Sequence, residues 1–122
     1  MRIVVVDDNQ DAADMLALLL ETTGAEVAVA YDGHSALELV RNERPSVVLL
    51  DIGLPDIDGY DVARAIRAQP EGAPVFLIAL TGYSREEDIQ RARDAGFDRH
   101  LVKPVDLSAL TAAIAAVAAP TQ

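Results

Sequence analysis

Short runs of β-branched and apolar residues recur along the chain, and each run has the length of one strand. The runs occupy residues 2–6, 26–30, 46–50, 75–80 and 97–102. Most positions within a run are apolar, rather than every second one, which favours strands that are buried on both faces. This pattern predicts the strands of a parallel sheet.

Segments with the apolar spacing of a helix follow these runs. In the clearest segment, apolar residues recur at intervals of one helical turn, which predicts a single apolar helix face. These residues are Ala12, Met15, Leu16, Leu19 and Leu20. The corresponding residues of the last segment are Leu107, Leu110, Ile114 and Val117.

Residues that commonly begin or end helices bracket these segments. They are Gly24 as a C-terminal cap, Asp32-Gly33 as a turn, Ser84 with Glu87 as a capping box, and Asp106 as an N-cap. Strand and helix therefore alternate five times along the sequence. Because right-handed crossovers place helices on both faces of such a sheet, the expected fold is a doubly wound (βα)5 α/β domain.

The length and composition favour one compact domain. With 122 residues, 51% of them hydrophobic, the chain can bury a core of its own. We expect this domain to span residues 1–119, with residues 120–122 as a tail or the start of a linker. Cysteine is absent, which excludes disulfides, thiolate metal sites and cysteine nucleophiles.

Charge and hydropathy narrow the choice of partners and location. A formal net charge of −10 repels phosphate backbones and anionic lipid surfaces, so we expect neither direct nucleic-acid binding nor membrane binding. No apolar run approaches the roughly 20 residues that span a bilayer, and no signal peptide is recognisable. These features predict a soluble protein of the cytoplasm.

Four of the five predicted strands end in residues that can take part in chemistry. Asp7 and Asp8 follow the first strand, Asp51 the third, Thr81 the fourth and Lys103 the fifth. Ligands of parallel α/β sheets bind at the carboxyl ends of the strands, so these residues are expected to share one cleft. Converging carboxylates need a cation, and oxygen ligands favour Mg²⁺. A carboxylate nucleophile beside a metal, a hydroxyl and an ammonium group indicates phosphoryl transfer to the carboxylate.

Four stretches and the spacing between them carry a family resemblance: VVVDDN at 4–9, LLDIGLPDIDGYD at 49–61, ALTGY at 79–83 and LVKPV at 101–105. Over nearly its whole length the chain resembles the receiver domain of two-component response regulators, the CheY-like proteins of bacterial signalling. The resemblance implies a flavodoxin-like fold with strand order 2-1-3-4-5. It also implies a signalling domain rather than an enzyme, one that catalyses only its own phosphoryl transfer and dephosphorylation.

The resemblance assigns a role to each strand-end residue. Asp51 would be the phosphoacceptor, and Thr81 and Lys103 would hold the phosphoryl group. Asp7 and Asp8 would hold Mg²⁺ directly or through water. The backbone carbonyl of Gly53 would complete the metal ligands.

The resemblance also implies partners. The phosphodonor would be a sensor histidine kinase or a histidine phosphotransfer protein. From the position of the predicted site, we expect this donor to dock near Gln10, Asp11, Asp14 and Pro104. The phosphorylated form would act on a downstream protein or domain, or form a homodimer. The expected surface for this output consists of Arg85, Arg91, Arg93, Asp98 and Arg99.

The chain departs from the family pattern at the switch position. Many receivers have Tyr or Phe three residues before the lysine, whereas this chain has His100. This histidine and the run GFDRHLVKPV resemble receivers attached to hybrid sensor kinases. Gly53 and Tyr83 occupy positions that in this family influence the lifetime of the phosphoryl group. Gly82, which has no Cβ atom, is expected to leave the approach to the phosphoacceptor open.

Three further carboxylates follow the predicted phosphoacceptor but stay outside the predicted site. Asp56, Asp58 and Asp61 are expected to cap the following helix and to face solvent. Gly59 is expected to lead the loop into that helix.

Two other functions stay open on the residues alone. A phosphatase of the haloacid dehalogenase type also combines a strand-end Asp with Mg²⁺, a hydroxyl and a lysine. That class uses a second Asp two residues after the nucleophile, where this chain has Gly53. The other alternative is an interaction module that uses the fold without being phosphorylated.

Overall fold

In the computed structural model, which describes residues 1–82 and 85–118, five strands and five helices alternate along the chain. The strands are β1 (Arg2–Val6), β2 (Glu26–Ala30), β3 (Val47–Asp51), β4 (Phe76–Thr81) and β5 (Arg99–Val102). The helices are α1 (Gln10–Glu21), α2 (Gly33–Glu43), α3 (Gly59–Ala68), α4 (Glu86–Ala95) and α5 (Leu107–Ala118). All strand pairs are parallel, in the order β2-β1-β3-β4-β5. The predicted fold class and strand order are confirmed.

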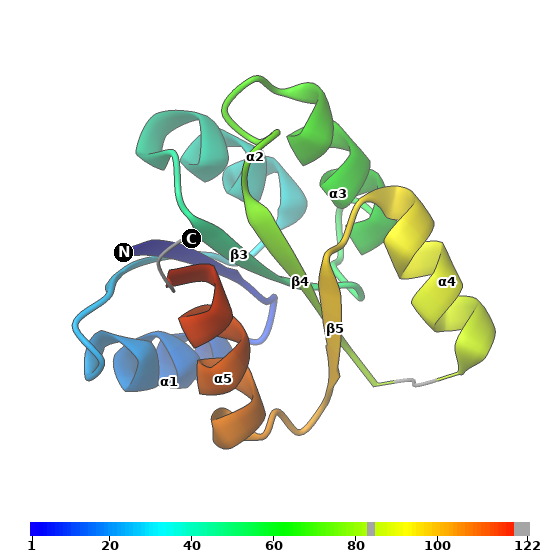
Figure 1. Ribbon diagram of the computed structural model, residues 1–122. Helices are drawn as coiled ribbons and strands as arrows, with labels where there is room; N and C mark the ends of the chain where they lie inside the picture. Colours follow the sequence, from blue (N-terminus) through cyan, green and yellow to red (C-terminus); the bar gives the residue numbers. More distant parts are fainter. Residues whose placement is uncertain (83–84, 119–122) are drawn as a thin grey trace.

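The sheet separates two hydrophobic cores, with α1 and α5 on one face and α2, α3 and α4 on the other (Figure 1). Alternate residues of β1 show the division. Ile3 and Val5 belong to the core under α1 and α5, whereas Val4 and Val6 belong to the other core. Every residue of the central strand β3 is buried, while the edge strands β2 and β5 are partly exposed. The most enclosed strand therefore ends in Asp51.

The strand boundaries differ slightly from the predicted ones. Strands β3 and β4 each begin and end one residue later, so Asp51 and Thr81 are the last residues of their strands. Strand β5 begins at Arg99, because Gly96 ends α4 with a φ of 109° and Phe97 turns into the core before the strand starts.

Helix α1 presents a different face to the sheet from the one that the apolar spacing predicted. Ala13, Ala17 and Leu20 are buried, whereas Met15 and Leu19 are 60% and 37% exposed. The small side chains of Ala13 and Ala17 let the helix lie close to the sheet, and Met15 and Leu19 are left uncovered. The prediction was therefore wrong for Ala12, Met15 and Leu19, which are exposed, and right for Leu20.

Helix α5 buries only the middle of its predicted face. Leu110 is buried and Ile114 is half-buried, but Leu107, the first residue of the helix, is 43% exposed. The side chain of Val117 lies outside the described part of the chain.

The helix termini largely follow the predicted signals. Gly24 adopts a φ of 93° after α1, and the Asp106 carboxylate accepts an amide hydrogen bond in the first turn of α5. Asp32 is the N-cap of α2 rather than only a turn residue, because its carboxylate accepts an amide of that helix. Ser84 lies outside the described residues. Among the helices in the described ranges, none is long and apolar enough to cross a membrane.

Candidate functional site

Parallel pairing brings the carboxyl ends of four strands to one edge of the sheet. Asp51 ends β3 and Thr81 ends β4, while Asp7 and Lys103 directly follow β1 and β5. The amides of Asp7, Ile52 and Lys103 donate to carbonyl oxygens of the neighbouring strands at 3.1, 3.1 and 2.8 Å. The backbone at the site is thus part of the hydrogen-bonded sheet.

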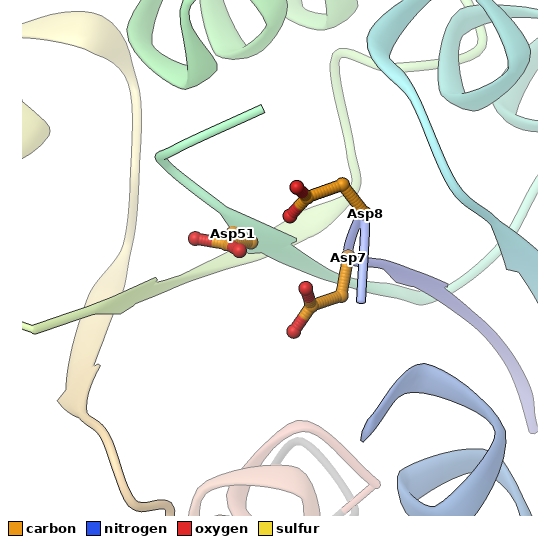
Figure 2. A group of neighbouring side chains, drawn as sticks. All are labelled: Asp7, Asp8 and Asp51. Carbon is orange, nitrogen blue, oxygen red and sulfur yellow. The ribbon is translucent and has the colours of Figure 1, made fainter. Parts of the chain in front are cut away.

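Three carboxylates meet at this edge (Figure 2). Asp7, Asp8 and Asp51 each offer a carboxylate oxygen, and these oxygens lie within 4.8 Å of one another. Figure 2 shows Asp7 and Asp8 at the end of β1 and Asp51 on the neighbouring β3. Asp7 and Asp51 are only 5% and 8% exposed, whereas Asp8 is exposed. The predicted cluster of carboxylates is therefore formed.

Lys103 reaches across the end of β4 to two of these carboxylates. Its Nζ donates to Asp51 Oδ2 at 2.9 Å and to Asp7 Oδ2 at 3.2 Å. The other oxygen of Asp51 accepts the amide of Gly53 at 3.0 Å, and that of Asp7 accepts the amide of Asn9 at 3.0 Å. Both buried carboxylates are thereby hydrogen-bonded through both oxygens.

The charges at this site are unevenly balanced. Burial raises the pKa of Asp7, and the negative charge of Asp51 raises it further, against the opposing effects of the Asn9 amide and Lys103. Burial by itself lowers the pKa of Lys103. The hydrogen bonds from Lys103 to Asp51 and Asp7, together with the negative charges of these two carboxylates, outweigh burial, so the pKa of Lys103 is raised. Lys103 pairs with two of the three clustered carboxylates, and the remaining negative charge favours a further cation.

The remaining predicted residues lie around this cluster. Thr81 is 7% exposed at the end of β4. His100 is half-buried on β5 and lines a small pocket that also involves Thr81 and Tyr60. Gly82 is exposed and has open space where a Cβ atom would lie. Tyr83 lies outside the described residues.

The three carboxylates that follow the predicted phosphoacceptor have different roles. Asp58 is the N-cap of α3, and Asp61 lies exposed in the first turn of the same helix. Asp56 is exposed as predicted, but the helix predicted for it was wrong, because its carboxylate accepts the backbone amides of Gly33 and His34 at the start of α2. The loop passes the first turn of α2 before α3 begins, a proximity that spacing along the chain does not reveal.

Asn9 is a site residue that the sequence analysis missed. Its side-chain oxygen caps α1 by accepting the amide of Ala12 at 3.1 Å, and its own amide donates to Asp7. An Asn directly before a helical segment is a common N-cap, so the signal was present in the sequence. Asn9 joins the start of α1 to the carboxylate cluster.

An apolar groove adjoins the cluster along α1. Its walls include Met15 and Leu19, which the sheet leaves uncovered, together with Pro104 and Val105 from the loop after β5. Lys103 also lines the groove, so the apolar surface is continuous with the polar cleft.

Comparisons with known proteins agree with this architecture. The family model of the response regulator receiver domain matches residues 3–115. The DNA-binding response regulator MtrA of Mycobacterium tuberculosis is 39% identical over 94% of this chain and 49% of its own length. An uncharacterised 14.6 kDa protein of Leptolyngbya boryana is 43% identical over 87% of this chain and 81% of its own length. The chain thus spans about half the length of the MtrA relatives that it matches.

Solved structures of similar proteins share the whole fold. The receiver domain of the sensor histidine kinase PA1611 from Pseudomonas aeruginosa, solved with a magnesium ion coordinated in its active site cleft, is 30% identical, with a TM-score of 0.88 over 97% of this chain and 98% of that one. The chemotaxis protein CheY4 of Vibrio cholerae is 28% identical, with a TM-score of 0.90 over 95% of this chain and 97% of that one. With the parallel sheet, the strand-end carboxylates and the family match over residues 3–115, the chain belongs to the response regulator receiver domains of bacterial two-component signalling.

Proposed function

We propose that this receiver accepts a phosphoryl group on the Asp51 carboxylate in a reaction that depends on Mg²⁺. The observation that carries the proposal is the ammonium group of Lys103, 2.9 Å from Asp51 Oδ2, within the same cluster as Asp7 and Asp8. Asp51 ends a fully buried strand, which fixes its carboxylate at the floor of the cleft. Such positioning supplies most of the catalysis in phosphoryl transfer.

The donor set suits Mg²⁺. The carboxylates of Asp7, Asp8 and Asp51 and the carbonyl of Gly53 are oxygen ligands, and Mg²⁺ in proteins usually combines one or two carboxylates with water. The exposure of Asp8 leaves room for water between this side chain and an ion. When bound, Mg²⁺ neutralises the charge that develops on phosphoryl oxygens.

In the proposed step, an oxygen of Asp51 attacks the phosphorus atom of a phosphohistidine. The new O–P bond forms in line with the breaking P–N bond, and the imidazole leaves with the electron pair of that bond and takes up a proton. The Lys103 ammonium group pairs with one phosphoryl oxygen, and the Thr81 hydroxyl donates to another. The product is an aspartyl phosphate, which water later hydrolyses.

The groove along α1 is the proposed docking site of the phosphodonor, a sensor histidine kinase or histidine phosphotransfer protein. An amphipathic helix that carries the phosphohistidine fits this groove, because Met15, Leu19 and Pro104 form apolar walls next to the cleft. Asp14, expected from the sequence to contact the donor, is exposed and accepts the hydroxyl of Tyr31 at 2.6 Å. In this proposal the apolar walls form the centre of the interface, and the exposed Asp11 and Asp14 of α1 stay expected contacts of the donor.

The output, which is the effect of phosphorylation on a downstream partner, is proposed to come from rearrangement around Thr81 and His100. Closure of Thr81 on the phosphoryl group is coupled in this proposal to His100, which lines the same small pocket. A coupling free energy of about 1–3 kcal/mol would change the affinity for an output partner, or for a second copy of the chain, roughly 5- to 150-fold. Of the expected readout residues, Arg91 stacks over the ring of Tyr60 at 4.3 Å. Asp98 pairs with Arg67 and so contributes to the fold.

The extent and setting of the domain belong to the same proposal. The receiver is proposed to span residues 1–119, which is supported by the family match over 3–115, with residues 120–122 as a tail or linker. The proposed donor, a histidine kinase, takes its phosphoryl group from ATP, so the proposed reaction takes place in the cytoplasm. Attachment to a hybrid sensor kinase, suggested by His100, stays a prediction.

The test is the intact mass of the protein after incubation with acetyl phosphate, with and without Mg²⁺. Wild type should gain one phosphoryl group only with Mg²⁺, and Asp51→Asn should gain none. Asp61→Asn is the matched control, because Asp61 is an exposed carboxylate in the first turn of the helix that follows the same loop, and this variant should behave as wild type.

Two outcomes would point to the other functions. Failure of wild type to gain mass or to bind beryllofluoride would favour an interaction module without phosphorylation. Rapid turnover of a small phosphate ester would favour a phosphatase, although the acid/base carboxylate of that class is replaced here by Gly53.

A further inference from the structure

We infer that Asp56 is a positioning residue for the proposed Mg²⁺ site, because it ties the loop that carries Gly53 to the start of helix α2. The inference rests on the proposed function, since this loop affects the reaction only if the Gly53 carbonyl and Asp51 hold the ion. Asp56 itself lies outside the cluster of three carboxylates and touches neither the ion nor the phosphoryl group in this scheme.

The loop that joins β3 to α3 spans residues 52–58 and is anchored at both ends. At its start, the amide of Ile52 donates to the carbonyl of Leu80 at 3.1 Å. At its end, the amide of Gly59 donates back to the carbonyl of Ile52 at 3.0 Å. The position of Gly53 therefore also depends on what holds the middle of the loop.

Asp56 holds the middle of the loop through both of its carboxylate oxygens. Oδ1 accepts the amide of Gly33 at 2.8 Å, and Oδ2 accepts the amide of His34 at 3.1 Å. Oδ2 also lies 2.7 Å from Nδ1 of the exposed His34 side chain. The two amides belong to the first turn of α2, where unpaired amides and the helix dipole favour a negative charge.

The absence of a side chain at Gly33 allows this contact. A Cβ atom there would lie 2.9 Å from Val62 Cγ2 on α3, 3.1 Å from Ile57 Cβ and 3.3 Å from Asp56 Oδ1. The first turn of α2 therefore packs against the loop and α3 at one point. The Asp56 side chain is 26% exposed, so these hydrogen bonds are partly shielded from water.

Loss of the Asp56 carboxylate would free the loop three residues from Gly53. The Gly53 carbonyl would then sample positions that do not face the ion, and metal binding would have to order the loop as well. Groups that orient metal ligands without touching the metal typically change its affinity by about 10- to 100-fold. Asp56 acts through several bonds of the chain, which places its effect at the lower end of that range.

The test is the dissociation constant of Mg²⁺ measured by isothermal titration calorimetry on folded protein. We expect Asp56→Ala to weaken binding about tenfold, and Asp56→Asn to weaken it less, because the amide oxygen can still accept the Gly33 hydrogen bond. Asp61→Ala removes the same charge from an exposed position and is the matched control. His34→Ala keeps both backbone amides. These two variants should bind Mg²⁺ within about twofold of wild type.

The outcomes separate this inference from the proposed site. Asp8→Asn removes a proposed metal ligand and should bind Mg²⁺ weakly, whether or not Asp56 has a positioning role. If Asp8→Asn binds Mg²⁺ weakly and Asp56→Ala binds it as tightly as Asp61→Ala does, the positioning role of Asp56 is wrong, whereas the proposed metal site is still supported. If wild type binds no Mg²⁺, or Asp8→Asn binds like wild type, the metal site is wrong and the inference falls with it.

A purely structural role would give a different pattern. It would lower the urea midpoint of Asp56→Ala and leave the Mg²⁺ dissociation constant of the folded protein unchanged, which would overturn the inference. If Asp56→Ala does not fold, Asp56→Asn and Gly33→Ala decide the question, because the second variant disturbs the same contact from the side of α2.

Discussion

Lys103 Nζ lies 2.9 Å from Asp51 Oδ2, although strand β4 separates the two strands that lead to these residues. The lysine side chain is 36% exposed, whereas the Asp51 side chain is 11% exposed. Because the same ammonium group also pairs with Asp7, one flexible side chain links the ends of β1, β3 and β5. A substitution of Asp7, Asp51 or Lys103 should therefore change the electrostatic environment of the other two residues.

Chemical labelling can test this linkage, because Lys103 is the only lysine in the sequence. Its raised pKa and its two carboxylate partners should make it react slowly with acetic anhydride at about pH 8, since only the neutral amine attacks. In Asp51→Asn the loss of one partner should speed acetylation roughly threefold or more, given that one pKa unit is a factor of ten. Mass spectrometry reads the modification, with the N-terminal amine as an internal control. Equal rates in both proteins would mean that the pair is weak in solution.

The docking groove predicts a difference between natural and small phosphodonors. Met15→Glu places a charge in the apolar wall and should lower kcat/KM for transfer from a cognate phosphohistidine protein about tenfold, as loss of a central interface residue does. Transfer from acetyl phosphate should be unchanged. Leu18→Glu is the control, because Leu18 is 62% exposed on the same helix and is not part of the groove lining. Equal slowing by the two variants would argue against the groove as the docking site.

Gly59 should be intolerant of any side chain. A Cβ atom at this position would lie 2.4 Å from the Cα and 2.8 Å from the carbonyl oxygen of Ile52, the residue after Asp51. Gly59→Ala should therefore lower the free energy of unfolding by about 1–3 kcal/mol, measured by urea denaturation. The added methyl group of Gly82→Ala meets no atom of the described residues within 4 Å, and this variant should cost less than about 0.5 kcal/mol. A similar cost for both variants would contradict the close approach at Gly59.

Arg67 is the strongest stability determinant that we predict away from the site. Its guanidinium group donates to the carbonyl of Gly96 at 3.0 and 2.8 Å, to the carbonyls of residues 72, 73 and 75, and to Asp98 Oδ2 at 2.7 Å. Lysine cannot reproduce this planar set of donors, so Arg67→Lys should cost roughly 2 kcal/mol of unfolding free energy. Arg64→Lys, on the same helix with an exposed partner, should cost less than about 0.5 kcal/mol in the same assay.

Asp56 should also contribute to acid stability. Its pKa lies well below the usual value, chiefly because the Gly33 amide donates to it, with further help from His34 against partial burial. A lowered pKa in the folded state means that the unfolded state takes up the proton first as the pH falls. The stability that Asp56 adds should be fully present above about pH 5 and should decline progressively below about pH 4, as the pH falls toward the lowered pKa of the folded state.

Urea unfolding of wild type and Asp56→Asn across this pH range measures the effect. The difference in unfolding free energy between the two proteins should be constant near neutral pH and shrink on acidification. Asp61→Asn controls for the loss of an exposed carboxylate. A difference between wild type and Asp56→Asn that does not depend on pH would show that the ionised carboxylate is not what stabilises this contact.

The strands and the residues at their ends could be predicted from the sequence because both depend on local patterns. A strand such as β3 is buried on both faces, so its sequence is continuously apolar until Asp51 interrupts it. Once the sheet is known to be parallel, the carboxyl ends of its strands must share one edge. The convergence of Asp7, Asp51 and Lys103 follows from that geometry.

The features that escaped prediction depend on neighbours that are distant in sequence. The buried face of α1 was misjudged because Met15 is as apolar as a core residue, and only the fold shows that alanines contact the sheet. Asp56 was assigned to the nearer helix because its capping preference does not say which helix start lies beside it in space. Arg67 gave no signal, because most of its acceptors are backbone carbonyls and its one carboxylate partner, Asp98, is 31 residues away in the sequence.

The three hydrogen bonds that extend the ladder past β1, β3 and β5 have a thermodynamic consequence for ligand binding. The backbone at Asp7, Ile52 and Lys103 has already lost its conformational freedom when the chain folds. An ion or phosphoryl group that enters the cleft therefore restricts only side-chain rotors and the loop beyond Ile52. The entropy change of binding should be dominated by released water, with a correspondingly small change in protein order.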